Sequence, residues 1–337
     1  MAVVKPFRAV RYDEEQAGEL AALVAPPYDV IGPAEREELR ARSPHNVVHL
    51  TLPDSEDEAA RLWREWRERG VLVEEEFPAV WELEQDYEGP DGWGRTRRGV
   101  VASLQPQPYE AGAVLPHERT HSGPKEERLR LLRAVGAQLE PILLLYEGPP
   151  PLSAAGKPDL ELEGVRLRRV AAIDVEQFFA DTQLLIADGH HRYETALEAG
   201  LDIPVVLVST SDPGLTIFPT HRIAERVGEV AGTEIERPEG ELPGVVLYRD
   251  GKYLLVEGEG LDVEVVERCA PEGVTYTPDR AEAEAAVDRG EAAAAFLVRP
   301  TPIDAVFERA RRGEVMPQKT TYFYPKLLSG LLFHPLD

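Results

Sequence analysis

Cysteine is almost absent from this chain, in which Cys269 is the only one among 337 residues. A single cysteine excludes an intrachain disulfide, so the sequence predicts a protein of a reducing compartment. No apolar run approaches the roughly 18 residues that a membrane-spanning helix needs. The first residues, MAVVKPFRAVRY, have neither a long apolar core nor a cleavage pattern, which argues against a signal peptide. We therefore expect a cytoplasmic protein that has no membrane partner.

Positive charge is also scarce. The chain has 37 basic residues against 61 acidic ones, which gives a net charge of −24. Such a surface repels the phosphate backbone of nucleic acids, so binding to DNA or RNA is disfavoured. Methionine occurs only twice, whereas arginine, glutamate and the 29 prolines are abundant. This composition is typical of thermophile proteins.

The pattern of apolar residues predicts an α/β protein of mixed α+β type, long enough for two or three domains. Helices are expected over residues 35–41, 56–69, from 124 onward, 193–199, 282–289 and 303–312. Strands are expected over 46–52, 80–87, 97–104, 139–146, 184–187, 203–208 and 293–298. The runs 245–248 and 253–257 flank Asp250-Gly251, a pair that favours a hairpin turn with positive φ.

The stretch LLIADGHHRYETAL, residues 184–197, carries the strongest functional signal. It predicts a buried strand, a sharp turn and a helix, and Asp188, Gly189, His190, His191 and Arg192 fall in the turn. The N-terminus of a helix binds anions because its first N–H groups are unpaired and its dipole favours negative charge. The sequence therefore predicts a phosphate site here, although Asp188 can also serve as a helix cap or hold Mg²⁺.

Residues 117–121 match the zinc signature H-E-x-x-H letter for letter. That chemistry needs both histidines on one stable helix, but Pro116 precedes the motif and Ser122-Gly123-Pro124 follows it. We therefore expect no zinc, and we interpret Glu118 as a carboxylate on a loop.

Three further motifs allow two interpretations each. The run APPYDVI at residues 25–31 is either a rigid connection or a projection of Tyr28-Asp29. His221-Arg222 is either a surface turn or a second polar site. The tail from Met316 to Leu332 places Lys319 and Lys326 among aromatic residues, which fits either a packed strand or a clamp for a base or phosphate.

Together these motifs resemble domain-of-unknown-function family 1015 over nearly the full length. The shared residues are Pro-Pro-Tyr-Asp-Val at 26–30, Pro116-His117-Glu118 with Thr120, IADGHHRYETA at 186–196, Asp212-Pro213-Gly214-Leu215, Pro219-Thr220-His221-Arg222 and the tail from Met316 to Lys326. This family resemblance implies no particular reaction.

Residues 100 to about 210 also resemble the ParB/sulfiredoxin superfamily, and within it the ADP-dependent free-serine kinases. That resemblance implies three regions: an N-terminal α+β region at 1–99, a nucleotide-binding domain at 100–224 and a C-terminal α+β region at 225–337. It implies that the turn at 188–192 holds the phosphates of ADP or ATP, with Mg²⁺ as an optional companion. Glu118 corresponds to the catalytic base toward a small hydroxyl-bearing substrate such as a serine-like amino acid. His191 is the second expected catalytic residue, while His117, Thr120, His221, Arg222, Lys319 and Lys326 are accessory candidates.

Two other functions fit the same residues. The chain is then either a nucleotide-binding regulatory module without turnover or a metal-dependent hydrolase that uses His117, His121 and the pair His190-His191. The residues leave the choice of nucleotide, the acceptor and the oligomeric state open.

Overall fold

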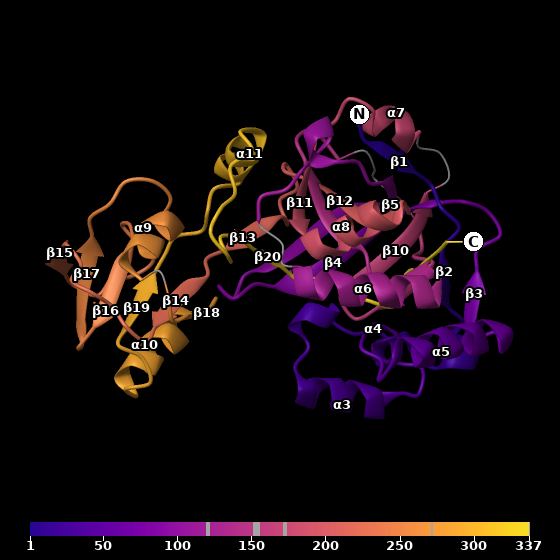
Figure 1. The fold of residues 1–337 in the computed structure, drawn as a ribbon, viewed down its shortest axis with the longest axis horizontal. Coiled ribbons are helices and arrows are strands. Elements are labelled where there is room, and N and C mark those ends of the chain that lie inside the picture. Colours follow the sequence, from indigo (N-terminus) through magenta and orange to yellow (C-terminus); the bar gives the residue numbers. More distant parts are fainter. Residues whose placement is uncertain (119–121, 151–155, 171–173, 271, 337) are drawn as a thin grey trace. The chain divides into compact units, whose positions relative to one another are not determined.

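The computed structural model describes residues 1–118, 122–150, 156–170, 174–270 and 272–336, and its contacts divide the chain into two compact units (Figure 1). Unit 1 comprises residues 1–87, 94–215 and 325–337, and unit 2 comprises residues 88–93 and 216–324. Both units contain helices and sheets, which confirms the predicted mixed α/β class. None of the described helices is long and apolar enough to cross a membrane.

These units do not follow the three expected regions. The strand β5, Gly94–Gln105, runs through the expected boundary at residue 99. Strands that precede β5 in the sequence and strands that follow it pair with it in one sheet. The segment 325–337 returns to unit 1 after unit 2.

The helices of unit 1 are α1 (Glu14–Ala17), α2 (Leu20–Leu23), α3 (Pro33–Arg42), α4 (Val48–Thr51), α5 (Glu56–Glu68), α6 (Ser122–Val135), α7 (Val175–Phe179) and α8 (His190–Ala199), with 3₁₀ turns η1 (Tyr28–Val30) and η2 (Tyr109–Ala111). Its strands are β1 (Val3–Lys5), β2 (Val10–Tyr12), β3 (Leu72–Glu74), β4 (Val80–Glu88), β5, β6 (Val114–Leu115), β7 (Ala137–Gln138), β8 (Ile142–Tyr146), β9 (Leu160–Leu162), β10 (Val165–Val170), β11 (Leu184–Asp188), β12 (Ile203–Ser209) and β21 (His334–Pro335). The large sheet has the order β6-β11-β8-β12-β5-β4-β10-β9, and β1 pairs with β5.

The centre of this sheet is buried on both faces. Every residue of β8 and β12 is buried, as expected for strands that are apolar along their whole length. Phe179 of α7 and Tyr193 and Ala196 of α8 pack on one face. On the other, Val101 and Val206 meet the leucines of residues 327–332. The strand β11 lies next to β8 in this sheet, and its residues from Leu184 to Ala187 are all buried.

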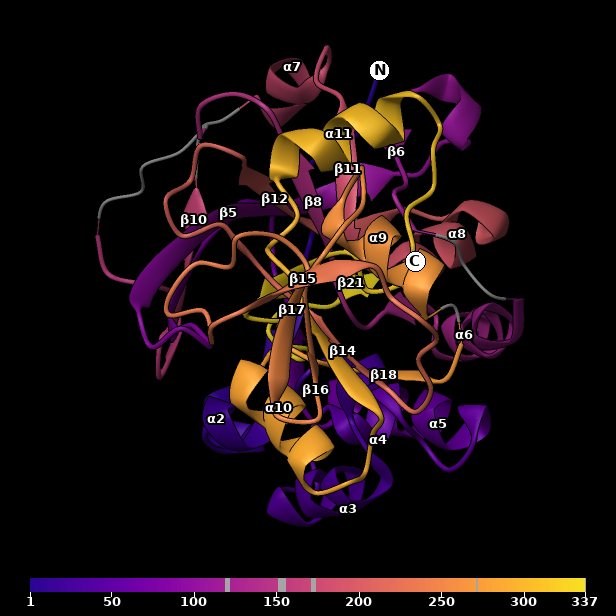
Figure 2. The same ribbon diagram turned by 90° about the vertical axis from the view of Figure 1, so that its left-hand side faces the viewer.

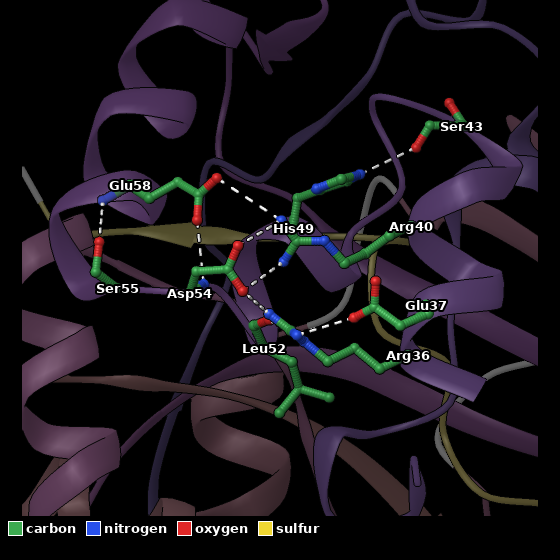
Figure 3. Close-up of polar contacts among 9 residues, drawn as sticks. All are labelled: Arg36, Glu37, Arg40, Ser43, His49, Leu52, Asp54, Ser55 and Glu58. Carbon is green, nitrogen blue, oxygen red and sulfur yellow. Dashed lines mark hydrogen bonds and ion pairs between the residues drawn. The ribbon is translucent and has the colours of Figure 1, made fainter. Parts of the chain in front are cut away.

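The prediction of a strand at residues 46–52 is wrong, since this segment contains the helix α4. The side chain of Asn46 turns the backbone: its Oδ1 accepts from the Val48 N–H at 3.0 Å, and its Nδ2 donates to the carbonyl of Ala22 at 2.8 Å. The segment after α4 is tied to α3, because Arg36 and Arg40 both reach the carboxylate of Asp54 (Figure 3). Apolar alternation alone did not reveal this local side-chain bonding.

Unit 2 contains β13 (Thr216–Phe218), β14 (His221–Ala224), β15 (Gly232–Ile235), β16 (Val246–Arg249), β17 (Lys252–Val256), β18 (Val274–Thr277), β19 (Ala294–Leu297), β20 (Tyr322–Tyr324), α9 (Asp262–Cys269), α10 (Arg280–Asp288) and α11 (Ile303–Arg311). Its main sheet is antiparallel with the order β15-β17-β16-β19-β14-β18. The helices α9 and α10 pack on opposite faces of it (Figure 2).

The predicted hairpin of unit 2 is confirmed, and the tail forms the packed strand that was one of its two interpretations. The strands β16 and β17 form the expected hairpin, with Asp250 at φ 52° and Gly251 at φ 74°. The aromatic tail forms β20, which pairs with β13 and buries Phe323.

Candidate phosphate-binding site

The turn after β11 has a backbone conformation that favours glycine at residue 189. The strand ends at Asp188 and α8 begins at His190, one turn earlier than the start expected at Tyr193. Gly189 has φ 98°, a value that residues other than glycine rarely adopt. A Cβ at this position would lie 2.5 Å from the Cγ2 of Ile142. The backbone therefore enters α8 through a sharp left-handed step.

The start of α8 has the properties of an anion site. Its N-cap residue is Gly189, which has no side chain to cap the helix. The first N–H groups of an α-helix have no acceptors within the helix and lie at the positive end of its dipole. His191 is half-buried in this first turn, and His190 and Arg192 are buried. This end of α8 is thus suited to phosphate oxygens.

The loop that carries Glu118 lies against the same turn. The strand β6 is parallel to β11, with Leu184 opposite Val114 and Leu185 opposite Leu115. Because parallel strands end at the same edge of a sheet, residues 116–118 follow β6 on the side where residues 189–190 follow β11. The backbone N–H of His117 donates to the Nε2 of His190 at 3.3 Å. Glu118 is therefore the next residue after a direct contact with the start of α8.

The hydrogen bonds of the two buried histidines define their tautomers. His117 Nδ1 lies 2.7 Å from the carbonyl oxygen of Ile186, which can only accept, so Nδ1 carries the proton. His190 Nε2 accepts from an N–H, so in the neutral ring its proton is on Nδ1. Burial lowers the pKa of His117 to about 4 and also lowers that of His190. Both rings are therefore neutral at pH 7 and hold the loop in place without adding charge.

The charged groups of the turn are paired with one another. Asp188 Oδ2 accepts from Arg192 Nη2 at 2.9 Å, and its Oδ1 accepts from Lys326 Nζ. Arg192 also donates to the carbonyl of Pro141. Burial acts to raise the pKa of Asp188, but Lys326 and Arg192 bring it down to about 2. The structure thus joins Asp188 to Lys326 and turns the guanidinium of Arg192 inward, whereas the sequence suggested a direct phosphate contact for Arg192.

A buried glutamate that sequence reasoning missed supports Arg192 from the other side. Glu140 Oε1 accepts from the Tyr28 N–H at 3.0 Å and from Ser329 Oγ at 2.7 Å. Burial raises the pKa of Glu140, and the charge of Arg192 opposes this shift. The 3₁₀ turn of the PPYDV motif is therefore fastened to the segment between β7 and β8. A lone glutamate in the apolar run LEPILLLY was the available signal.

The remaining candidates belong to unit 2 or are outside the described residues. His221, Arg222 and Lys319 belong to unit 2. His221 Nδ1 accepts from the Val298 N–H at 3.2 Å, and Arg222 donates to the carbonyls of Thr220, Gln318 and Lys319. Lys319 is exposed. Thr120 and His121 are outside the described residues, and the described part of the chain contains no group of three or more side chains suited to hold a metal.

Solved structures with some similarity include three of particular interest. A conserved hypothetical protein from Pyrococcus furiosus is 20% identical, with a TM-score of 0.37 over 63% of this chain and 87% of that one. A free serine kinase in complex with AMP is 20% identical, with a TM-score of 0.40 over 67% and 86% of the two chains. A C-terminally truncated SbnI from Staphylococcus aureus is 13% identical, with a TM-score of 0.41 over 66% and 84%. These values are too low to transfer an activity.

A search of curated proteins finds no match. The family model described as "protein of unknown function (DUF1015)" matches residues 4–237, which is more than half of the chain. The chain therefore belongs to this family.

Proposed function

We propose that this protein is a nucleotide-dependent phosphotransferase that acts on a small hydroxyl-bearing metabolite such as a serine-like amino acid. The phosphates of ADP or ATP bind at the start of α8, over Gly189 and the N–H groups of the following residues. Glu118 is the catalytic base, and His191 assists at the phosphates. The likeness of the central region to the ParB/sulfiredoxin superfamily is part of this proposal.

One observation carries the proposal. The N–H of His117 contacts His190 at 3.3 Å, which brings the residue before Glu118 onto the first turn of α8. The two motifs are separated by 73 positions in the sequence, yet they meet at one edge of the sheet. A phosphate cradle and a carboxylate on adjacent loops are the two parts that phosphoryl transfer to a hydroxyl requires.

The chemistry follows from these parts. The acceptor hydroxyl oxygen forms a bond to the terminal phosphorus while the bond between that phosphorus and the nucleotide's bridging oxygen breaks. Glu118 takes the hydroxyl proton, and the leaving nucleotide keeps the bond's electron pair. Hydrogen bonds from the N–H groups of α8 and from His191 stabilise the charge on the phosphate oxygens. Catalysis of this kind depends on position and charge more than on covalent chemistry.

Arg192 and Asp188 take supporting roles. The guanidinium of Arg192 is buried between Asp188 and the carbonyl of Pro141, so it fixes the turn. Each carboxylate oxygen of Asp188 already forms an ion pair, one with Arg192 and one with Lys326. Asp188 therefore does not offer the open carboxylate that a Mg²⁺ site needs. No step of the proposed reaction depends on a metal at Asp188.

The test is Glu118→Gln, which keeps the size of the side chain and removes the proton acceptor. We expect phosphoryl transfer to fall by roughly 10² to 10⁴, the usual contribution of a general base. Nucleotide affinity should stay within about twofold, because the carboxylate faces the acceptor. Phosphoryl transfer is measured from labelled ADP and ATP to a panel of serine-like hydroxyl compounds, and nucleotide affinity is measured by calorimetry. The exposed Glu126 on α6, changed to glutamine, is the matched control.

Each other outcome leads to a different conclusion. Loss of nucleotide binding in Glu118→Gln would make the residue structural. Unchanged transfer would remove it from the mechanism. Nucleotide binding by the wild type without transfer to any acceptor would favour the regulatory module.

A further inference from the structure

Lys326 joins the candidate site from a distant part of the sequence. It follows unit 2 in the chain, in the segment 325–337 that belongs to unit 1. Its Nζ forms an ion pair with Asp188 Oδ1, across 138 positions. Asp188 is the residue directly before Gly189, so the ammonium group lies beside the entrance to α8. Neither a helix pattern nor a strand pattern in the sequence joins these two residues.

Two cations share one carboxylate at the entrance to α8. Asp188 pairs with two cations, Arg192 and Lys326, and the charge of Glu140 also acts on Arg192. The side chain of Arg192 is only 8% exposed and that of Asp188 16%, whereas that of Lys326 is 24% exposed. The cation of this group that is most accessible to solvent is therefore Lys326. Its charge adds to the positive end of the α8 dipole.

We propose that Lys326 is the phosphate-binding cation of this site and that Asp188 positions it. Its ammonium group takes the place on the Asp188 carboxylate that Mg²⁺ would take in a metal-assisted phosphotransferase. The ligand it serves is the terminal phosphate of a nucleoside diphosphate or triphosphate bound at α8. This inference rests on the proposed function, since it names the group that neutralises the phosphates.

The chemistry of the two cations supports this assignment over one to Arg192. A lysine ammonium has three donors on a flexible stem, so contact with a phosphate oxygen is compatible with its pair to Asp188. The planar guanidinium of Arg192 is instead held by two fixed acceptors, the Asp188 carboxylate and the carbonyl of Pro141. A fixed Arg192 keeps Asp188 in place, and Asp188 in turn keeps Lys326 at the entrance to α8.

The experiment compares three variants in ADP binding by calorimetry, each with Mg²⁺ and with EDTA. Lys326→Gln removes the charge, and Lys326→Arg retains it. Lys125→Gln is the matched control, because Lys125 is 29% exposed and pairs with Glu198 at the other end of α8. We expect Lys326→Gln to weaken ADP binding by about ten- to a hundredfold, the range for a charge-assisted hydrogen bond. Lys326→Arg should restore most of the affinity, and Lys125→Gln should bind as the wild type does.

The Mg²⁺ arm separates Lys326 from a metal site. We expect the loss in Lys326→Gln to be the same in EDTA as in Mg²⁺. A folded Lys326→Gln protein that binds ADP within about twofold of the wild type would overturn the proposal and leave a structural ion pair. A loss of ADP affinity in Lys326→Gln that occurs only in Mg²⁺ buffer would also overturn the proposal. The melting temperature of each variant establishes whether it is folded.

Inorganic pyrophosphate distinguishes failure of this proposal from failure of the proposed function. If the wild type binds pyrophosphate but no nucleotide, and Lys326→Gln does not bind it, Lys326 remains a phosphate cation and the nucleotide assignment falls. If the wild type binds neither probe, both proposals fall.

Discussion

Two regions of this protein carry the same pair of residue types, histidine and arginine, and use them differently. His190 and Arg192 lie in the first turn of a helix, whereas His221 and Arg222 lie in the strand β14. All four residues are buried. The backbone N–H groups of a strand pair with the next strand, and here both β18 and β19 flank β14. Those at a helix start remain directed outward.

The comparison shows that the same side-chain types make different contacts in the two regions. Arg222 binds backbone carbonyls, and the ring of Tyr276 lies 5.5 Å from its guanidinium. Arg192 binds a carboxylate that also holds Lys326. Only the second arrangement lies at a helix start, where the positive end of the dipole and Lys326 are close together. The function of a His-Arg pair thus depends on the backbone that carries it.

The largest expected difference concerns the two arginines. Arg192→Gln leaves Asp188 short of one buried partner, and breaking a buried ion pair costs about 3–5 kcal/mol. Arg222→Gln leaves backbone carbonyls, rather than a carboxylate, without their donor. The free energy of unfolding should therefore fall by only about 1–3 kcal/mol. Urea unfolding followed by circular dichroism measures both. Equal losses would show that the two arginines have the same structural role.

The second prediction concerns the glycines at the two ends of α8. Gly189→Ala combines an unfavourable φ with a contact of 2.5 Å to Ile142, and should cost about 2–5 kcal/mol. Gly200→Ala has φ 69° but no atom within 4 Å, so its cost should be only about 1–2 kcal/mol. Thermal unfolding of the two variants provides the measurement. A Gly189→Ala protein as stable as Gly200→Ala would contradict the tight packing of the turn.

The smallest difference is expected in acid, where both regions should behave alike. Burial lowers the pKa of both His117 and His221 from 6.5 to about 4 in the folded protein. The folded state thus binds these protons less readily than the unfolded state. The stabilisation is complete above pH 6.5 and is lost as the pH falls toward 4, by about 3 kcal/mol for each histidine.

His117→Gln and His221→Gln each remove one such titration. Each should make the free energy of unfolding less dependent on pH between 6.5 and 4, and by a similar amount. A profile that stays as steep as the wild type's in either variant would show that the histidine is not held neutral.

The sequence predicted the local parts of the site better than its long-range contacts. The apolar run Leu184–Ala187 predicted β11, and Gly200 predicted the end of α8, because periodicity and capping are local properties. The pair of Asp188 with Lys326 was not predictable in this way, since it spans 138 positions. Glu140 was missed because its partners, Tyr28 and Ser329, come from opposite ends of the chain. The error at residues 46–52 arose where one asparagine side chain outweighed an apolar alternation.

The return of residues 325–337 to unit 1 has a consequence for biosynthesis. Ser103 of β5 and His334 are hydrogen-bonded across 231 positions, and β21 pairs with β7. A ribosome must therefore release all of unit 2 before the sheet and core of unit 1 can be completed. Until then, the strands of unit 1 lack the leucines that cover one face, and the entrance to α8 lacks Lys326. If Lys326 has the role proposed above, a partly synthesised chain lacks this cation until the last residues of unit 1 have been added.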